Sequence, residues 1–174
     1  MDRQSVRYNE AMDRIWAPWR LSYIEGQKSV EGCVFCIAAA EQIDAENLIV
    51  ERAKHCMVML NRYPYNSGHL MVIPYVHAAD LSLIGAEVRA EMMELSEKWS
   101  RVIAEAYHPH GFNLGVNIGK SAGAGIAEHL HMHIVPRWNG DVNYMTTVGN
   151  TRVLPEALAD SYTRLIAAAE KLSS

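Results

Sequence analysis

The chain has 174 residues, of which 49% are hydrophobic and 21% charged, a composition typical of one globular domain. Its formal net charge of −4 gives no basic field for a nucleic acid polymer or an anionic membrane, so we expect neither partner. No apolar run is long enough to span a bilayer, and residues 1–8 hold no apolar signal segment, so we expect a cytoplasmic protein. The odd number of cysteines favours a metal site or a redox pair over a disulfide framework.

The first part of the chain predicts an extension followed by a small sheet. We expect residues 1–31 to pack on the core as an N-terminal extension, with Pro18 preventing a regular helix. A short helix over Val34–Ala40 follows. Short apolar runs separated by turn-forming residues then predict antiparallel strands. These strands are expected at Leu48–Glu51, Cys56–Leu60 and His69–Ile73.

The second part predicts a long helix and two more strands. Between Gly85 and Tyr107, apolar residues recur every three or four positions, which indicates a helix with one buried face. A strand over 112–118, a glycine-rich connection over 119–125 and a strand over 129–135 follow. Pro155 then suits the first turn of a final helix. We assign residues 32–138 to one domain and 139–174 to a loop and helix of that same domain.

Three histidines near the end of the domain form the most informative pattern. His129, His131 and His133 alternate with Leu130 and Met132. On a strand, side chains two apart share a face at steps of about 6.6 Å, so the imidazoles would point the same way. They could bind a catalytic zinc ion that keeps an open water position. Alternatively, one imidazole could attack phosphorus while its neighbours stabilise the developing charge.

Cys33 and Cys36 have the spacing of zinc ligands but supply two of the four positions of a tetrahedral site. Histidines are the available source of the remaining two. His77 and one end histidine of the triad are candidates, and His55 is a weaker one. Such a closed site would be structural and would leave the other imidazoles free, which favours the nucleophile interpretation. The alternative for the two cysteines is a pair of small apolar positions on a buried helix face.

The histidine pattern resembles the signature of the histidine triad superfamily. His129–Val135 matches its alternation of histidine and apolar residues at every position. The likeness extends over about residues 32–138 and includes the Leu60–Pro74 segment. Two flanking motifs, Trp16–Arg20 and Pro136–Asp141, are similar to bacterial members that are diadenosine tetraphosphate phosphorylases or hydrolases.

The resemblance implies catalytic and metal-binding roles. The middle histidine, His131, would attack the α-phosphorus of a nucleotide and form a covalent nucleotidyl-imidazole intermediate. His133 would contact the phosphate. In zinc-containing bacterial members the metal is structural, which implies a structural zinc ion here. Its ligands would be Cys33, Cys36, His77 and His129.

The resemblance also implies a nucleotide site. Asn61 would contact the ribose, His69 would line the same pocket, and Asn117 would lie beside the reacting centre. Backbone N–H groups of the glycine loop could bind an anion, and its lysine could bind outer phosphates. The loop residues that we assign to nucleotide binding are Gly119, Lys120, Ser121, Gly123 and Gly125. The approach to the triad, residues 125–128, lacks the Gln or Ser that many members carry.

The sequence therefore predicts an α+β fold with a five-stranded antiparallel sheet, one long helix and shorter helices, and the resemblance implies a homodimer that joins two sheets. The predicted function is cleavage of dinucleoside polyphosphates such as diadenosine tetraphosphate, by phosphorolysis to ADP and ATP. A water-dependent dinucleoside polyphosphate hydrolase and a nucleoside phosphoramidase are alternatives within the same chemistry. A catalytic-zinc hydrolase and a nucleotide sensor without turnover are alternatives of other classes.

Overall fold

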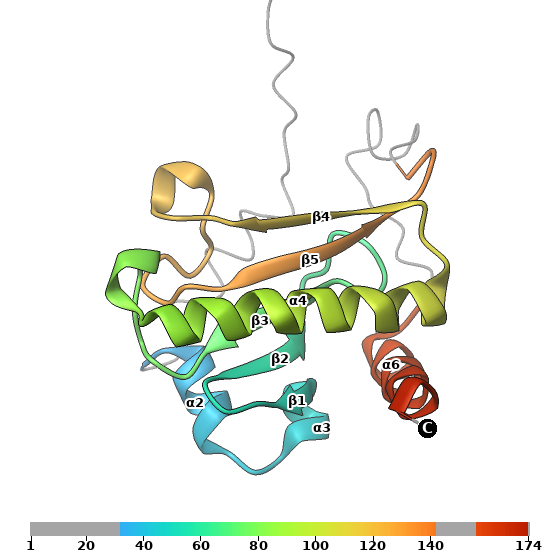
Figure 1. The fold of residues 1–174 in the computed structure, drawn as a ribbon, viewed down its shortest axis with the longest axis horizontal. Coiled ribbons are helices and arrows are strands. Elements are labelled where there is room, and N and C mark those ends of the chain that lie inside the picture. Colours follow the sequence, from blue (N-terminus) through green and yellow to red (C-terminus); the bar gives the residue numbers. More distant parts are fainter. Residues whose placement is uncertain (1–31, 142–155, 174) are drawn as a thin grey trace, which may run out of the picture.

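Five antiparallel strands form a single sheet in the order β1-β2-β3-β5-β4 (Figure 1). The structure is a computed structural model, and it describes residues 32–141 and 156–173. The strands are β1 (Ile49–Arg52), β2 (Cys56–Leu60), β3 (Leu70–Pro74), β4 (Gly111–Val116) and β5 (Met132–Arg137). The predicted sheet is thus confirmed.

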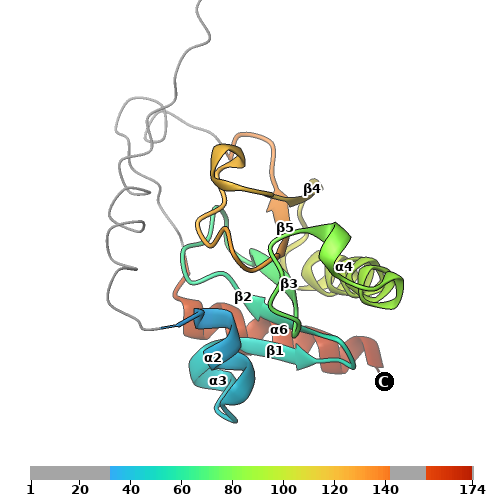
Figure 2. The same ribbon diagram turned by 90° about the vertical axis from the view of Figure 1, so that its left-hand side faces the viewer.

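The helices lie on both sides of this sheet. They are α2 (Val34–Ala40), α3 (Asp44–Asn47), α4 (Ala86–Tyr107) and α6 (Leu158–Ser173), with short 3-10 turns η2 (Leu81–Leu83) and η3 (Lys120–Ala122). Figure 2 shows α4 on one side of the strands and α2 on the other. None of the helices within the described ranges is long and apolar enough to cross a membrane.

Strands β2 and β3 are buried on both faces, and their alternation divides the core into two parts. Cys56 and Val58 point to the side of α4 and belong to the larger apolar cluster. Met57 and Met59 point to the opposite side and pack with Phe35 of α2. The sheet therefore separates two apolar clusters, one on each face. A binding site on the sheet needs a part of one face that other elements leave uncovered.

The long helix α4 covers the first of these faces. Its buried residues follow the predicted helical spacing and include Val88, Met92 and Trp99. The indole Nε1–H of Trp99 donates to Oε2 of Glu51 at 2.6 Å, so the buried ring keeps its hydrogen bond. This confirms the predicted amphipathic helix.

The start of the histidine strand was predicted wrongly. The prediction was 129–135, whereas β5 begins at Met132, so His129 and His131 precede the strand. This segment does not pair with β3, because its backbone forms a hydrogen bond with another part of the chain. The N–H of Leu130 donates to the carbonyl of Ala78 at 2.6 Å, and the last β3–β5 pair involves Met132.

Helix α6 closes the larger core at the end of the sheet. Leu165 and Ala168 of α6 are buried against residues of α4. Pro155, predicted to begin this helix, and residues 1–31 lie outside the described residues. The assignment of segments to an extension and one domain stays a prediction.

Leu165→Ala should destabilise the fold because it leaves a cavity between α6 and α4. Leu165 is fully buried, and such truncations cost about 2–5 kcal/mol. Leu172→Ala is the matched control, since Leu172 lies on the same helix and is 52% exposed. Urea unfolding should show a change within about 0.5 kcal/mol for the control. Equal effects of the two variants would contradict the docking of α6.

Candidate active site and metal centre

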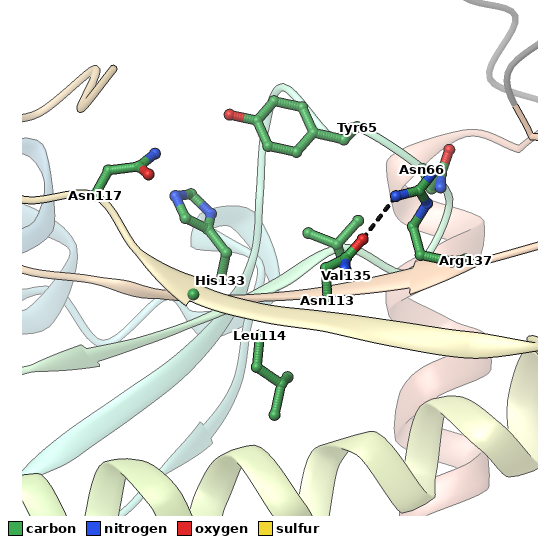
Figure 3. A pocket seen from close by; sticks show the side chains of 9 residues that line it. Tyr65, Asn66, Asn113, Leu114, Asn117, His133, Val135 and Arg137 are labelled. Carbon is green, nitrogen blue, oxygen red and sulfur yellow. Dashed lines mark hydrogen bonds between the residues drawn. The ribbon is translucent and has the colours of Figure 1, made fainter. Parts of the chain in front are cut away.

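A cleft of about 330 Å³ opens on the face of the sheet opposite α4 (Figure 3). From β5, His133, Val135 and Arg137 share this face because they are two residues apart. Asn113, Gly115 and Asn117 come from β4 and the residue after it, and Tyr65 and Asn66 from the connection between β2 and β3. In Figure 3 the side chain of Leu114 points the other way, toward α4.

The middle histidine of the triad is held in one tautomer. The Nδ1 atom of His131 lies 2.9 Å from the backbone carbonyl oxygen of His129. A carbonyl only accepts hydrogen bonds, so Nδ1 carries the proton and Nε2 of the neutral ring keeps a lone pair. Burial lowers the pKa of His131, opposed in part by the same hydrogen bond. The ring is therefore neutral at neutral pH and has a lone pair on Nε2, which is what the predicted nucleophile role requires.

The third histidine has the opposite arrangement. The backbone N–H of Tyr65 donates to Nδ1 of His69 at 3.0 Å, which places the proton of neutral His69 on Nε2. That atom lies 3.0 Å from Nδ1 of His133 and donates to it. The proton of neutral His133 is then on its Nε2, so this ring offers a hydrogen-bond donor. His69 is completely buried, and this water-excluded position strengthens the chain of hydrogen bonds.

The ring of Phe35 connects the cysteine motif to the triad. Its centroid lies 5.4 Å from that of His129 and 5.2 Å from that of His131. Phe35 is buried and lies between the two cysteines on α2. Helix α2 therefore packs directly against His131, the predicted nucleophile.

The predicted zinc ligands come together from three separate parts of the chain. The ligand atoms of Cys33, Cys36, His77 and His129 all lie within 4.8 Å of one another. Sγ of Cys33 is 3.2 Å from Nδ1 of His129, and Sγ of Cys36 is 3.3 Å from Nδ1 of His77. Zinc bonds of about 2.0 Å to nitrogen and 2.3 Å to sulfur place tetrahedral ligand atoms about 3.5 Å apart.

The donor set fits a structural zinc ion. Nε2 of His129 donates to the backbone carbonyl of Pro74 at 2.8 Å, so the proton is fixed there and Nδ1 is free to bind metal. Two thiolates and two imidazoles fill a tetrahedral site and leave no open position for substrate. His131 and His133 are outside this cluster. The triad is thus divided: His129 belongs to the candidate metal cluster, His133 lines the cleft, and His131 lies between them in the sequence.

The predicted nucleotide ligands are placed in different ways. Asn117 lines the cleft together with His133. Asn61 holds the following turn, because its Oδ1 accepts from the N–H of Tyr63 at 2.9 Å, and its Nδ2 lies 3.4 Å from Nδ1 of His69. Asn61 is not among the residues that line the cleft. The roles of these residues toward a ligand stay predictions.

The glycine loop forms an exposed turn after β4. Gly119 and Gly123 have φ of +79° and +85° at the two ends of η3, a conformation that favours glycine. Lys120 and Ser121 are exposed, and Gly125 is half-buried. Glu128, between this loop and the triad, is also exposed. The anion-binding role of the loop stays a prediction.

Sequence reasoning did not assign several residues of the cleft. Arg137 forms a two-point ion pair with Asp141 and donates from Nη1 to Oδ1 of Asn113 at 2.6 Å. This pairing holds the pKa of Asp141 well below its usual range. Tyr65 and Gly115 were also missed. The signal that could have found Arg137 was its even spacing from His133 on the same strand face.

A family model described as the HIT domain matches residues 42–140. The chain belongs to the HIT domain family. The AP-4-A phosphorylase of Mycobacterium tuberculosis (strain ATCC 25618 / H37Rv) is 39% identical over 165 residues, which cover 91% of this chain and 85% of that protein. The recognition of the histidine triad in the sequence is thus confirmed.

Two solved structures extend the comparison to the HIT fold. A Zn-bound histidine triad family protein from Mycobacterium smegmatis is 31% identical, with a TM-score of 0.67 over 82% of this chain and 96% of that protein. The diadenosine triphosphate hydrolase of Plasmodium falciparum has a TM-score of 0.61 at 16% identity, over 74% of this chain and 80% of that one. The second likeness shows the fold alone.

Replacing Cys33 and Cys36 together by serine should remove zinc, because two of the four ligands are lost. Metal analysis should show zinc falling from one ion per chain to almost none. The melting temperature should fall by more than about 4 °C, since 1 kcal/mol shifts a domain of this size by about 2–4 °C. Cys56→Ala is the control, because Cys56 is buried outside the cluster. Zinc retained by the double variant would point to a metal held by the histidines.

Proposed function

We propose that this chain is an enzyme that cleaves dinucleoside polyphosphates by nucleotidyl transfer through His131. The observation that carries the proposal is the hydrogen bond from Nδ1 of His131 to the carbonyl of His129, which leaves Nε2 as a lone pair in a buried ring. The name of the 39%-identical relative, AP-4-A phosphorylase, supports diadenosine tetraphosphate as the substrate. Membership of the HIT domain family supports the use of the triad.

The first step forms a phosphorus–nitrogen bond. Nε2 of His131 attacks the α-phosphorus with its lone pair, and the bond from this phosphorus to the bridging oxygen breaks. With diadenosine tetraphosphate the leaving group is ATP, and AMP stays on the imidazole. His133 donates from Nε2 to an oxygen of the reacting phosphate, which stabilises the charge that develops. In this scheme Asn61 and His69 line the pocket of the transferred nucleotide, and Asn117 lies beside the reacting phosphate.

The second step releases the nucleotide to an acceptor. An oxygen of inorganic phosphate attacks the α-phosphorus, the phosphorus–nitrogen bond breaks, and His131 returns to the neutral form with Nδ1 still protonated. The product is ADP. Water in place of phosphate would give AMP. Phosphorolysis is favoured by the name of the relative that matches most of this chain.

The metal centre contributes to this scheme by holding the triad segment. A zinc ion bound by Cys33, Cys36, His77 and His129 would link α2 to the residue whose carbonyl orients His131. The alternative of a catalytic zinc ion is disfavoured, because the cluster contains one triad histidine and two thiols in a closed set. The zinc ion is therefore proposed as structural.

We also propose a homodimer joined through β4. This strand lies at the end of the sheet order, so its outer edge pairs with no other strand in the part of the chain that is described. Leu114 on this strand is 47% exposed, and Met93 on α4 is 54% exposed. An unpaired strand edge, together with exposed apolar side chains on β4 and α4, suits the pairing of two sheets.

Product analysis tests the choice of acceptor. The purified protein is incubated with diadenosine tetraphosphate with and without inorganic phosphate, and nucleotides are separated by chromatography. We expect ADP and ATP in equal amounts when phosphate is present, because both displacements then occur. AMP and ATP without phosphate dependence would indicate a hydrolase. No product in either reaction would favour a nucleotide sensor.

His131→Ala should lower the rate of product formation by about a thousand-fold or more, because the nucleophile is removed. Substrate binding, measured by calorimetry, should persist. In the wild-type protein, a rapid acid-free quench with radiolabelled substrate should reveal AMP bound to His131. Turnover retained by His131→Ala, or an adduct on another residue, would overturn the assignment of the nucleophile.

A further inference from the structure

Gly115 is an unusual residue for its place in the sheet. It lies near the end of β4 and pairs with His133 of β5 in the antiparallel register. Glycine inside a strand weakens it, because it has no side chain to pack and the largest loss of backbone entropy. Strand glycines often mark a place where a ligand approaches the backbone closely.

The conformation of Gly115 does not require glycine. Its φ is outside the left-handed region, so other residues can adopt the same backbone. A Cβ built at this position would meet no heavy atom within 4 Å. Neither backbone strain nor a steric clash within the chain therefore explains the glycine.

The open space beside Gly115 belongs to the cleft. Gly115 lines the cleft, lies between Asn113 and Asn117 in the sequence, and pairs with His133 of the neighbouring strand. A side chain at this position would point into the cleft, as those of Asn113 and Asn117 do, because alternate residues of a strand share a face. The glycine thus keeps this part of the cleft clear.

We infer that Gly115 is a specificity-determining residue that leaves room for the leaving nucleoside polyphosphate, next to the reacting phosphorus. This inference rests on the proposed function and adds the place of the leaving group. Asn61, which the proposed function assigns to the transferred nucleotide, contacts His69 but does not line the cleft, whereas His133 lines it. The cleft is therefore assigned to the leaving group.

The other residues of the cleft suit a phosphate chain that continues into a second nucleoside. The amides of Asn113 and Asn117 offer donors along the floor, and Tyr65 offers an aromatic ring above it (Figure 3). Arg137 lies at the far end, with its charge partly balanced by Asp141. A small leaving group would not reach these residues and would not need the room at Gly115.

Gly115→Val tests the inference with two substrates that donate the same AMP group. Diadenosine tetraphosphate has a large leaving group, and adenosine 5′-phosphoramidate has ammonia. We expect kcat/KM for diadenosine tetraphosphate to fall at least about tenfold, and kcat/KM for the phosphoramidate to stay within about threefold. Gly115→Ala should lower the ratio of kcat/KM for diadenosine tetraphosphate to kcat/KM for the phosphoramidate as well, by a smaller factor.

Gly111→Val is the matched control. Gly111 is on the same strand, a Cβ there also meets nothing within 4 Å, and the residue does not line the cleft. We expect it to change neither rate. Light scattering should give the same molar mass for all variants. If Gly115→Val has an altered mass, the ratio of the two kcat/KM values measured for Gly115→Ala decides the test.

The outcomes separate this inference from the proposed function. If the wild-type protein cleaves neither substrate, the proposed function fails. If it cleaves both and Gly115→Val lowers both rates equally, the space serves the common nucleotide, and the inference is overturned. It is also overturned if neither rate changes, or if Gly111→Val produces the same selectivity.

Discussion

The site depends on the contacts made by one residue, His129. Its Nδ1 lies in the cluster with Cys33 and Cys36, its Nε2 donates to the carbonyl of Pro74, and its own carbonyl accepts from Nδ1 of His131. The candidate metal cluster and the proposed nucleophile are therefore joined by a single residue. A structural metal ion with no open position would contribute to the proposed chemistry by fixing the carbonyl that sets the tautomer of His131.

The two triad histidines outside the metal cluster, His131 and His133, have complementary hydrogen bonding. His131 is left with a lone pair on Nε2, whereas His133 is left with a proton there, because His69 donates to its Nδ1. The backbone N–H of Tyr65 sets the direction of this chain. A nucleophile and a donor for the developing charge can thus lie side by side, with ring centroids 4.8 Å apart.

The two-sided burial of the central strands decides where the cleft can form. Helices α4 and α6 pack on one face of the sheet, whereas the cleft opens on the other face, the one with Phe35 and His133. The cleft lies over β5 and the edge strand β4, where no further strand or helix of the described chain covers that face. Gly115 lies on β4, the strand at the end of the sheet order. The proposed dimer interface and the proposed site of the leaving group are therefore next to each other.

Much of the fold and of the candidate site could be predicted from the sequence alone, because it depends on local patterns of residues. The spacing of apolar residues determined α4, the alternation at His129–His133 identified the family signature, and the Cys33–Cys36 spacing indicated a metal site. The tertiary structure alone decided which nitrogen of each histidine carries a proton, since that depends on carbonyls and N–H groups brought together from distant segments. It also decided that His131 lies before the strand and that Gly115 borders open space, because long-range hydrogen bonding and packing leave no signature in a local window of sequence.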